Sequence, residues 1–163
     1  MWTVIKWAIP TIVLIALVGA LLTKKTFRIE HDVAAPPEVV WQVLMDTAAY
    51  PEWNPVFIAV DGDYVEGASV VNTVRDPSVS ETDMRAKVRT VSAAAELRQS
   101  GGMPGIITFD HRWLLEPIDG GTRIVQHETD RGIGLWFWNS DWIEPAYTKT
   151  SEALGRRAEA LTR

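Results

Sequence analysis

Residues 106–129 read IITFDHRWLLEPIDGGTRIVQHET and decide the fold class, because they form two strand-like runs around a tight turn. Asp119-Gly120-Gly121 separates the runs, and an Asp-Gly pair in that position favours a β-hairpin. Successive side chains of a strand point to opposite faces. One face of the first run therefore carries Ile107, Phe109, His111, Trp113 and Leu115. We expect an antiparallel pair with this face turned inward.

Five more segments have the strand pattern, and turn residues separate them. They are residues 26–34, 56–60, 68–74, 83–92 and 96–100. The last four follow one another with no helical stretch between them, which is typical of an antiparallel sheet. Together with the hairpin, the pattern predicts a sheet that makes up most of the chain.

Helical periodicity appears on both sides of this run of strands. Residues 38–46 follow Ala35-Pro36-Pro37 and carry apolar residues at helical spacing, and Tyr50–Pro55 forms a short turn or helix between prolines. A long amphipathic helix begins near Pro145, or as early as Trp138, and runs to the end. We predict one α+β domain over residues 26–163, in which the sheet curls and the last helix closes its open side.

Residues 7–23, WAIPTIVLIALVGALLT, contain no charge. A helix of this length covers roughly 25 Å of a hydrocarbon core about 30 Å thick, and Lys6 can extend towards the interface. We predict a transmembrane anchor within residues 1–25. Two alternatives are a signal peptide cleaved near Val18-Gly19-Ala20 and a buried core helix.

The net charge also differs between the predicted anchor, residues 1–25, and the rest of the chain. The whole chain carries −5, and removing Lys6, Lys24 and Lys25 leaves 13 basic and 21 acidic residues, or −8. Such a surface is unsuited to anionic lipid, so the predicted anchor would provide the membrane contact. Lys24, Lys25 and Arg28 outweigh Lys6, which favours a cytoplasmic domain on a single-pass membrane protein.

Several function classes find no support in the residues. The acidic balance argues against nucleic-acid binding, and the absence of cysteine excludes thiol chemistry. No nucleotide-binding glycine motif and no GxSxG or SxxK nucleophile is present. His31, His111 and His127 lack metal-ligand spacing, so a zinc site would require the fold to gather them. We therefore predict no metal and no cofactor.

Four motifs resemble those of one family. They are APPEVVW at 35–41, YPEWNP at 50–55, HRWLLEP at 111–117 followed by GGTR at 120–123, and SEALGRRAE at 151–159. In this order they are similar to SRPBCC domains, also called START or Bet v 1-like, of the polyketide cyclase/dehydrase branch. The resemblance spans residues 27–161. It implies a helix-grip fold, in which a curved seven-stranded antiparallel sheet wraps around a long C-terminal helix. It also implies a cavity for lipids, polyketides, sterols, quinones or hormones, and catalysis in only some members.

The inward face of the hairpin and the many tryptophans supply candidate cavity residues. We predict that a ligand cavity is lined by Trp53, Phe57, Phe109, His111, Trp113, Trp138 and Trp142. His111 is the one weak candidate for a catalytic residue, as a general acid or base, but no partner is visible at a fixed spacing, which favours a hydrogen-bonded interior histidine. The aromatic segment from Trp136 to Trp142 suits a cavity entrance, a bilayer interface or plain packing of the last helix.

These observations predict a membrane-tethered binding domain for a small lipophilic ligand, held between the sheet and the last helix. One alternative is an enzyme of the cyclase or dehydratase kind that uses polar cavity groups such as His111. Another is a non-catalytic interaction module that docks a protein through Trp136–Trp142. A contiguous exposed aromatic patch with no cavity beneath it would favour the last reading.

Overall fold

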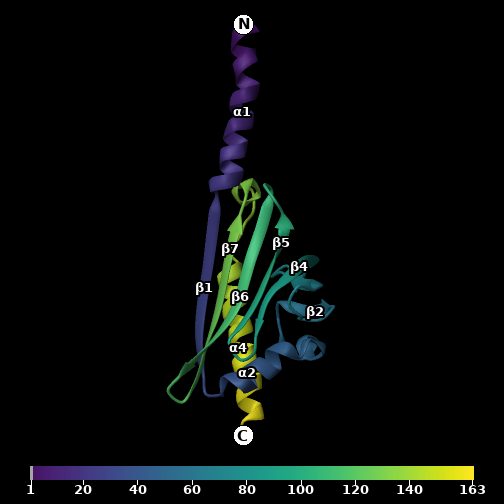
Figure 1. Ribbon diagram of the computed structural model, residues 1–163, viewed down its shortest axis with the longest axis vertical. Helices are drawn as coiled ribbons and strands as arrows, with labels where there is room; N and C mark the ends of the chain where they lie inside the picture. The colour runs from purple at the N-terminus through teal and green to yellow at the C-terminus, as the bar shows by residue number, and fades with distance from the viewer. Residues whose placement is uncertain (1) are drawn as a thin grey trace.

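The computed structural model describes the backbone of residues 2–163 and the side chains of residues 6–19 and 22–163. Its seven strands form one antiparallel sheet in the order β1-β7-β6-β5-β4-β3-β2 (Figure 1). They are β1 (Lys24–Val33), β2 (Phe57–Asp61), β3 (Ser69–Arg75), β4 (Glu81–Ser92), β5 (Glu96–Met103), β6 (Ile107–Ile118) and β7 (Gly121–Arg131). The predicted α+β class with a seven-stranded antiparallel sheet is confirmed.

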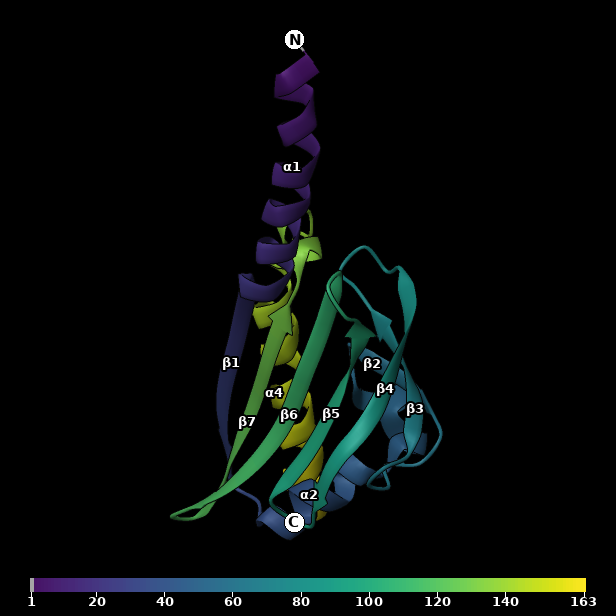
Figure 2. The same ribbon diagram turned by 45° about the horizontal axis from the view of Figure 1, so that its top comes forward.

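The helices lie at the ends of the sheet and on one of its faces. They are α1 (Trp2–Leu22), α2 (Pro37–Met45), η1 (Thr47–Ala49), α3 (Tyr50–Trp53), η2 (Ile133–Trp136) and α4 (Ile143–Leu161). The curled sheet partly surrounds α4, as Figure 2 shows, in the helix-grip arrangement that the resemblance implied. Pro145 lies in the first turn of α4, where a missing backbone N–H breaks no hydrogen bond of the helix.

A two-residue turn sets the register of the central hairpin. Ile118 pairs with Gly121, and Gly120 takes the positive φ of +77° that such a turn requires. Counting back along both strands places His111 directly opposite Glu128. The inward row of β6 therefore lies beside the even-numbered residues of β7.

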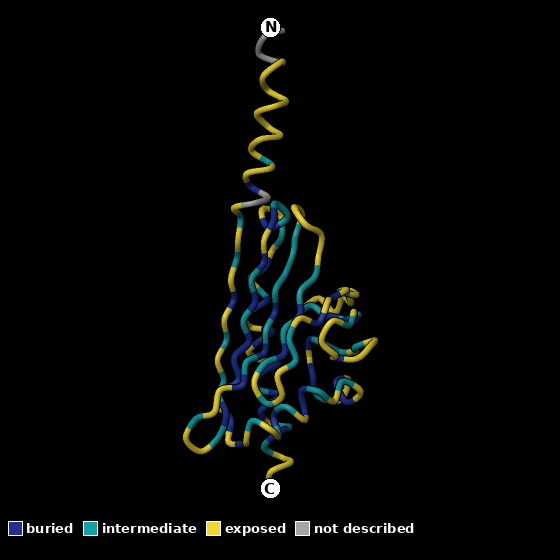
Figure 3. The backbone as a smooth tube through the Cα atoms, in the orientation of Figure 1, coloured by how far each residue is buried: buried dark blue, intermediate teal, exposed yellow. Residues whose placement is uncertain are grey.

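One end of the domain has a continuous apolar core, which we call the packed end. α2 and the C-terminal half of α4 cover this part of the sheet, near the bottom of Figure 1. The packed end contains Val40, Leu44, Trp113, Leu115, Ile124 and Leu154, all buried. Figure 3 shows the buried positions gathered there and along the inner face of the sheet.

α1 extends away from the domain (Figures 1 and 2), and side chains such as Trp7 and Leu14 are exposed. The alternative of a buried core helix is therefore wrong. Among the residues whose side chains are described, no helix is long and apolar enough to cross a membrane. The predicted anchor over residues 7–23 and the single-pass localisation are thus not confirmed. Residues 1–5, 20 and 21 of the predicted anchor segment lie outside the described side chains.

Candidate functional site

A cavity of about 760 Å³ lies between the inner face of the sheet and the N-terminal half of α4. Exposed residues such as Thr82, Asp83 and Met103 contribute to its wall, so it opens to solvent beside β4. Most of the remaining wall is apolar. This apolar wall comprises Val56, Phe57, Val74, Met84, Ile107, Phe109, Trp138, Trp142 and Ile143. A volume of this size suits a small organic molecule.

β5 makes room for the aromatic wall. A Cβ atom at Gly101 would collide with the carbonyl oxygen of Arg85 on β4 and would lie 2.7 Å from Cζ of Phe109, closer than side-chain atoms pack. Because glycine has no Cβ, β4 and the Phe109 ring can both approach β5 closely at this position. Any other residue at position 101 would require the β4 backbone and this ring to shift.

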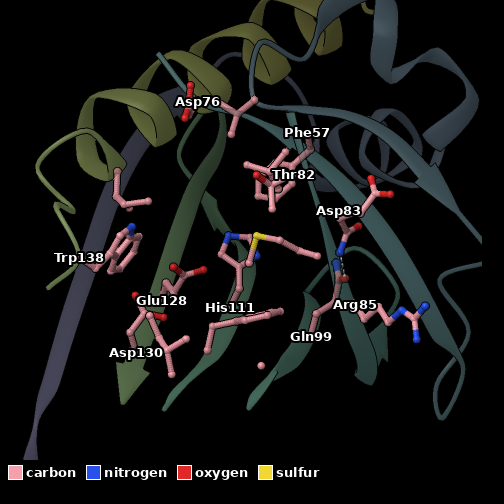
Figure 4. Close-up of a pocket in the computed structure, with 18 of the residues that line it drawn as sticks. Phe57, Asp76, Thr82, Asp83, Arg85, Gln99, His111, Glu128, Asp130 and Trp138 are labelled. Atoms are coloured by element: carbon pink, nitrogen blue, oxygen red, sulfur yellow. Dashed lines mark hydrogen bonds between the residues drawn. The ribbon is translucent and has the colours of Figure 1, made fainter. Parts of the chain in front are cut away.

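β7 contributes two buried carboxyl groups to the opposite wall. Glu128 and Asp130 are only 6% and 2% exposed, and both line the cavity. They follow Gln126 on the same face of the strand, because alternate residues of β7 point inward. In Figure 4 both carboxyl groups lie near Trp138, on the side of the cavity away from Arg85.

Burial controls the protonation of these carboxyl groups. Removal from water, together with the negative charge of Asp130, raises the pKa of Glu128 to about 8. Burial likewise raises the pKa of Asp130 to about 7, against the opposing effects of Glu128 and of the Lys25 charge. The Tyr147 hydroxyl donates a hydrogen bond of 2.7 Å to Oε2 of Glu128. The pair therefore holds a proton close to neutral pH, where an ordinary carboxyl pair holds none.

His111 is a neutral member of the cavity wall. Burial lowers its pKa to about 4, and its Nε2 lies 3.4 Å from Oε1 of Gln126. Gln126 uses its Nε2 to donate to the Tyr147 carbonyl and to Ser151 Oγ, which leaves its Oε1 as an acceptor. His111 therefore carries its hydrogen on Nε2. The acidic partner that an acid–base role would need does not lie at this nitrogen.

A second polar group lies on the β3–β5 side of the cavity. The Tyr64 hydroxyl donates to Oδ1 of Asn72 at 3.0 Å, and Nδ2 of Asn72 donates to Oε1 of Gln99 at 2.9 Å. All three side chains are buried, and Asn72 and Gln99 line the cavity. Because these groups satisfy one another, they provide a fixed polar surface at little cost.

The structure brings together five of the predicted cavity residues. Phe57, Phe109, His111, Trp138 and Trp142 line the cavity. Trp113 does not line it, although it lies on the same strand face as His111, because it packs within the apolar core of the packed end. Its ring meets that of His111 edge-on at 5.7 Å. Trp53 also lies away from the cavity wall and packs against Tyr50 with ring centroids 5.1 Å apart.

The aromatic segment divides into two parts. Trp138 and Trp142 turn inward and line the cavity. Trp136 and Phe137 are 51% and 86% exposed, and Trp136 Nε1 donates to Thr23 Oγ1 at the end of α1. A cavity thus lies behind half of the segment, which removes the observation that would have favoured an interaction module.

Sequence reasoning missed Glu128 and Asp130. On this part of β7 it considered only His127, as one of three histidines without metal-ligand spacing. The turn at Asp119-Gly120 held the necessary information, since it fixes the pairing of His111 with Glu128. Within the part of the chain that the structure describes, no three His, Cys, Asp or Glu side chains are close enough to hold a metal ion.

Three comparisons with known proteins place the chain among related folds. A family profile described as "Polyketide cyclase / dehydrase and lipid transport" matches residues 24–159. No curated protein sequence matches the chain.

Solved structures also match the fold of the chain, at low sequence identity. The aromatase/cyclase Zhui from Streptomyces sp. R1128 is 17% identical with a TM-score of 0.70, over 86% of this chain and 97% of that one. Ara h 8.0201 is 16% identical with a TM-score of 0.62, over 85% of this chain and 97% of its own. The di-domain ARO/CYC StfQ from the steffimycin biosynthetic pathway is 13% identical with a TM-score of 0.62, over 84% of this chain and 50% of its own. At these identities the likeness shows the fold alone.

Proposed function

Because the chain belongs to the polyketide cyclase/dehydrase and lipid transport family, we propose that it binds a small lipophilic molecule between the sheet and α4. The observation that carries this proposal is the cavity of about 760 Å³ with its predominantly apolar wall. A ligand that buries about 300 Å² of apolar surface there would gain about 7 kcal/mol from the hydrophobic effect, before the costs of binding. The buried polar groups at the edge of this wall would orient it.

A thermal-shift series with lipophiles of graded size tests this proposal. A ligand that binds only the folded state raises the melting temperature in a concentration-dependent way. Native mass spectrometry of the same mixtures should show a one-to-one complex. If no fatty acid, fatty alcohol, quinone or aromatic polyketide produces either result, the chain does not use this cavity for lipophiles.

Two tryptophan variants on one strand separate cavity binding from adhesion to the apolar surface of α1. Ile107 lines the cavity, whereas Thr108 is the next residue of β6 and points to the other face of the sheet. Ile107→Trp puts an indole ring into the cavity, which should reduce the space for a ligand and weaken binding. Thr108→Trp adds the same indole outside and should leave binding unchanged.

A second function, cyclase or dehydratase chemistry, is favoured by a different observation. Glu128 and Asp130 hold a proton near neutral pH inside the cavity, as a general acid or base requires. This assigns proton transfer to the β7 carboxyls rather than to His111, whose pKa of about 4 keeps it neutral. A poly-β-ketone that loses water in the presence of the protein, but not with Glu128→Gln, would support catalysis. Turnover that is lost with His111→Phe and kept with Glu128→Gln would overturn this assignment.

A further inference from the structure

One oxygen at the carboxyl end of the cavity has no partner. Oδ2 of Asp130 is buried and has no neutral or cationic hydrogen-bond donor among the residues that the structure describes, and only the carboxyl proton shared with Glu128 is available to this side chain. The rest of the Asp130 side chain is equally enclosed, at 2% exposure, and it lines the cavity. A buried carboxylate oxygen normally accepts one or more hydrogen bonds. A donor group of a bound molecule would supply the missing one.

The charged groups around Asp130 leave its charge largely uncompensated. On β1, Lys25 pairs with Asp130 across the strands, but its Nζ donates to Ser140 Oγ at 2.8 Å. Among the described residues, no ion pair within 4.0 Å joins Lys25 to Asp130. Glu128, from β7 itself, adds a second acidic group.

In the part of the chain whose side chains are described, the other elements packed against the pair supply no cation within ion-pair distance. On α4, Tyr147 donates its hydroxyl hydrogen to Glu128. On β6, His111 is neutral, and the carboxylate of Asp110 is held by Arg98 and Arg112. Among the described residues, the carboxyl pair is therefore short of positive charge, and its hydrogen-bond donors are the Tyr147 hydroxyl and the proton that the two carboxyls share.

From this arrangement we infer that the ligand is a lipophilic amine, whose ammonium group donates to Oδ2 of Asp130 while its apolar body lies along Phe57 and Phe109. The inference rests on the proposed function and names the chemical class of its ligand. An ammonium group supplies both things that this end of the cavity lacks, a hydrogen-bond donor and a positive charge. A fatty acid would bring a second anion beside buried carboxyls, which is unfavourable.

Aromatic side chains next to the carboxyl pair also suit a cation. Trp138 lines the same cavity as Glu128 and Asp130, and Figure 4 shows all three on the side away from Arg85. The face of an indole ring attracts ammonium groups. Phe57, His111 and Tyr147 form a connected aromatic group, with ring centroids 5.3 to 6.3 Å apart. The alkyl groups next to the nitrogen would contact these rings.

Three eight-carbon probes that differ only in their headgroup test the inference. Octylamine, 1-octanol and octanoate are titrated into the full-length protein at pH 7 by isothermal calorimetry, below their micelle concentrations. We expect octylamine to bind about tenfold or more tightly than 1-octanol, because a charged hydrogen bond in a dry site is stronger than a neutral one. Octanoate should be the weakest.

A second readout follows from the carboxyl pair. An ammonium group beside it favours the ionised forms, so octylamine binding should release up to about one proton per ligand. The release is measured by repeating the titration in buffers of different ionisation enthalpy. 1-Octanol should release none. The double variant Glu128→Gln/Asp130→Asn keeps the side-chain shapes and should abolish both the proton release and the preference for the amine, while 1-octanol still binds.

The outcomes separate this inference from the proposed function. If 1-octanol binds as tightly as octylamine, or the double variant keeps the amine preference, the inference is wrong and lipophile binding stands. If octylamine binds Ile107→Trp as tightly as it binds the native chain, its site is outside the cavity and the inference is also wrong. If none of the three probes binds and the wider lipophile series also fails, the proposed function itself is overturned.

Discussion

The two ends of α4 face the same sheet, yet one is packed and the other is hollow. At the packed end, Leu154 is fully buried among residues of α2, β6 and β7. At the cavity end, Ile143 and Tyr147 face a space that the sheet does not fill. The difference arises because α2 covers only one end of the concave face, and because the inward residues of β7 change from Ile124 to Glu128 and Asp130. One end holds the fold together, and the other is free to receive a ligand.

The largest expected effect compares truncations at the two ends of α4. Leu154→Ala should lower the free energy of unfolding by about 4 kcal/mol, because the cavity that it creates is enclosed by rigid neighbours. Ile143→Ala should cost only about 2 kcal/mol, because its side chain already borders open space. Urea denaturation followed by tryptophan fluorescence measures both. Equal losses would mean that the two ends are equally well packed.

The next largest effect is the contribution of the carboxyl pair to the pH dependence of the free energy of unfolding. The raised pKa of Glu128, about 8, means that the folded state holds a proton that the unfolded chain has already lost above about pH 4.5. Stability from this group is therefore complete at low pH and declines as pH rises towards 8, by up to about 1.4 kcal/mol per pH unit.

His111 has the opposite effect over a lower range. Its pKa of about 4 lies below the unfolded value of 6.5, so its contribution falls as pH drops from 6.5 towards 4. The carboxyl effect should consequently stand alone between about pH 6.5 and 8. Urea denaturation in that range should show a falling stability for the native chain and a flat one for Glu128→Gln/Asp130→Asn. A native chain that is also flat would show that the carboxyls are already ionised.

A smaller effect is expected from removing the hydrogen bond that joins the carboxyl pair to Tyr147 of α4. Tyr147→Phe removes the hydroxyl that donates to Glu128 Oε2 and should cost about 1 kcal/mol of stability. Because that hydrogen bond lowers the pKa of Glu128, its loss should raise this pKa further and move the pH-dependent decline to higher pH. Infrared titration of the carboxyl stretching band would follow the shift. Phe57→Leu, which alters an adjacent ring that makes no hydrogen bond to Glu128, serves as the control.

The sequence predicted the strands and helices of both ends, but it did not predict which end is packed and which contains the cavity. The Asp119-Gly120 turn and the alternation of β6 predicted the hairpin, and helical periodicity predicted α4. Trp113 and His111 share one row of β6, so no local pattern could show that α2 covers the first and leaves the second facing the cavity. That depends on where a distant helix crosses the sheet.

Glu128 and Asp130 were missed for another reason. From Gln126 to Asp130 every residue of β7 is polar, so alternation shows no inward side. Carboxyl groups are also rarely buried, which favours placing them in solvent. The turn sets the register of the hairpin, and this register places Glu128 opposite His111, whose side chain faces inward. Only this pairing shows that Glu128 and Asp130 face inward too.

The smallest expected effect concerns an ion pair on the surface of the packed end. Arg157 of α4 donates to Glu52 of α3 at 2.9 Å, but both side chains are well exposed to water. Solvent screens such a pair, so Arg157→Ala should change the free energy of unfolding by at most about 0.5 kcal/mol, against about 4 kcal/mol for Leu154→Ala three residues earlier. Urea denaturation at low and at high salt should give nearly the same small difference. If Arg157→Ala approaches the cost of Leu154→Ala, the packed end is held together by surface charge as much as by its apolar core, and the contrast with the cavity end would have to be explained by electrostatics instead.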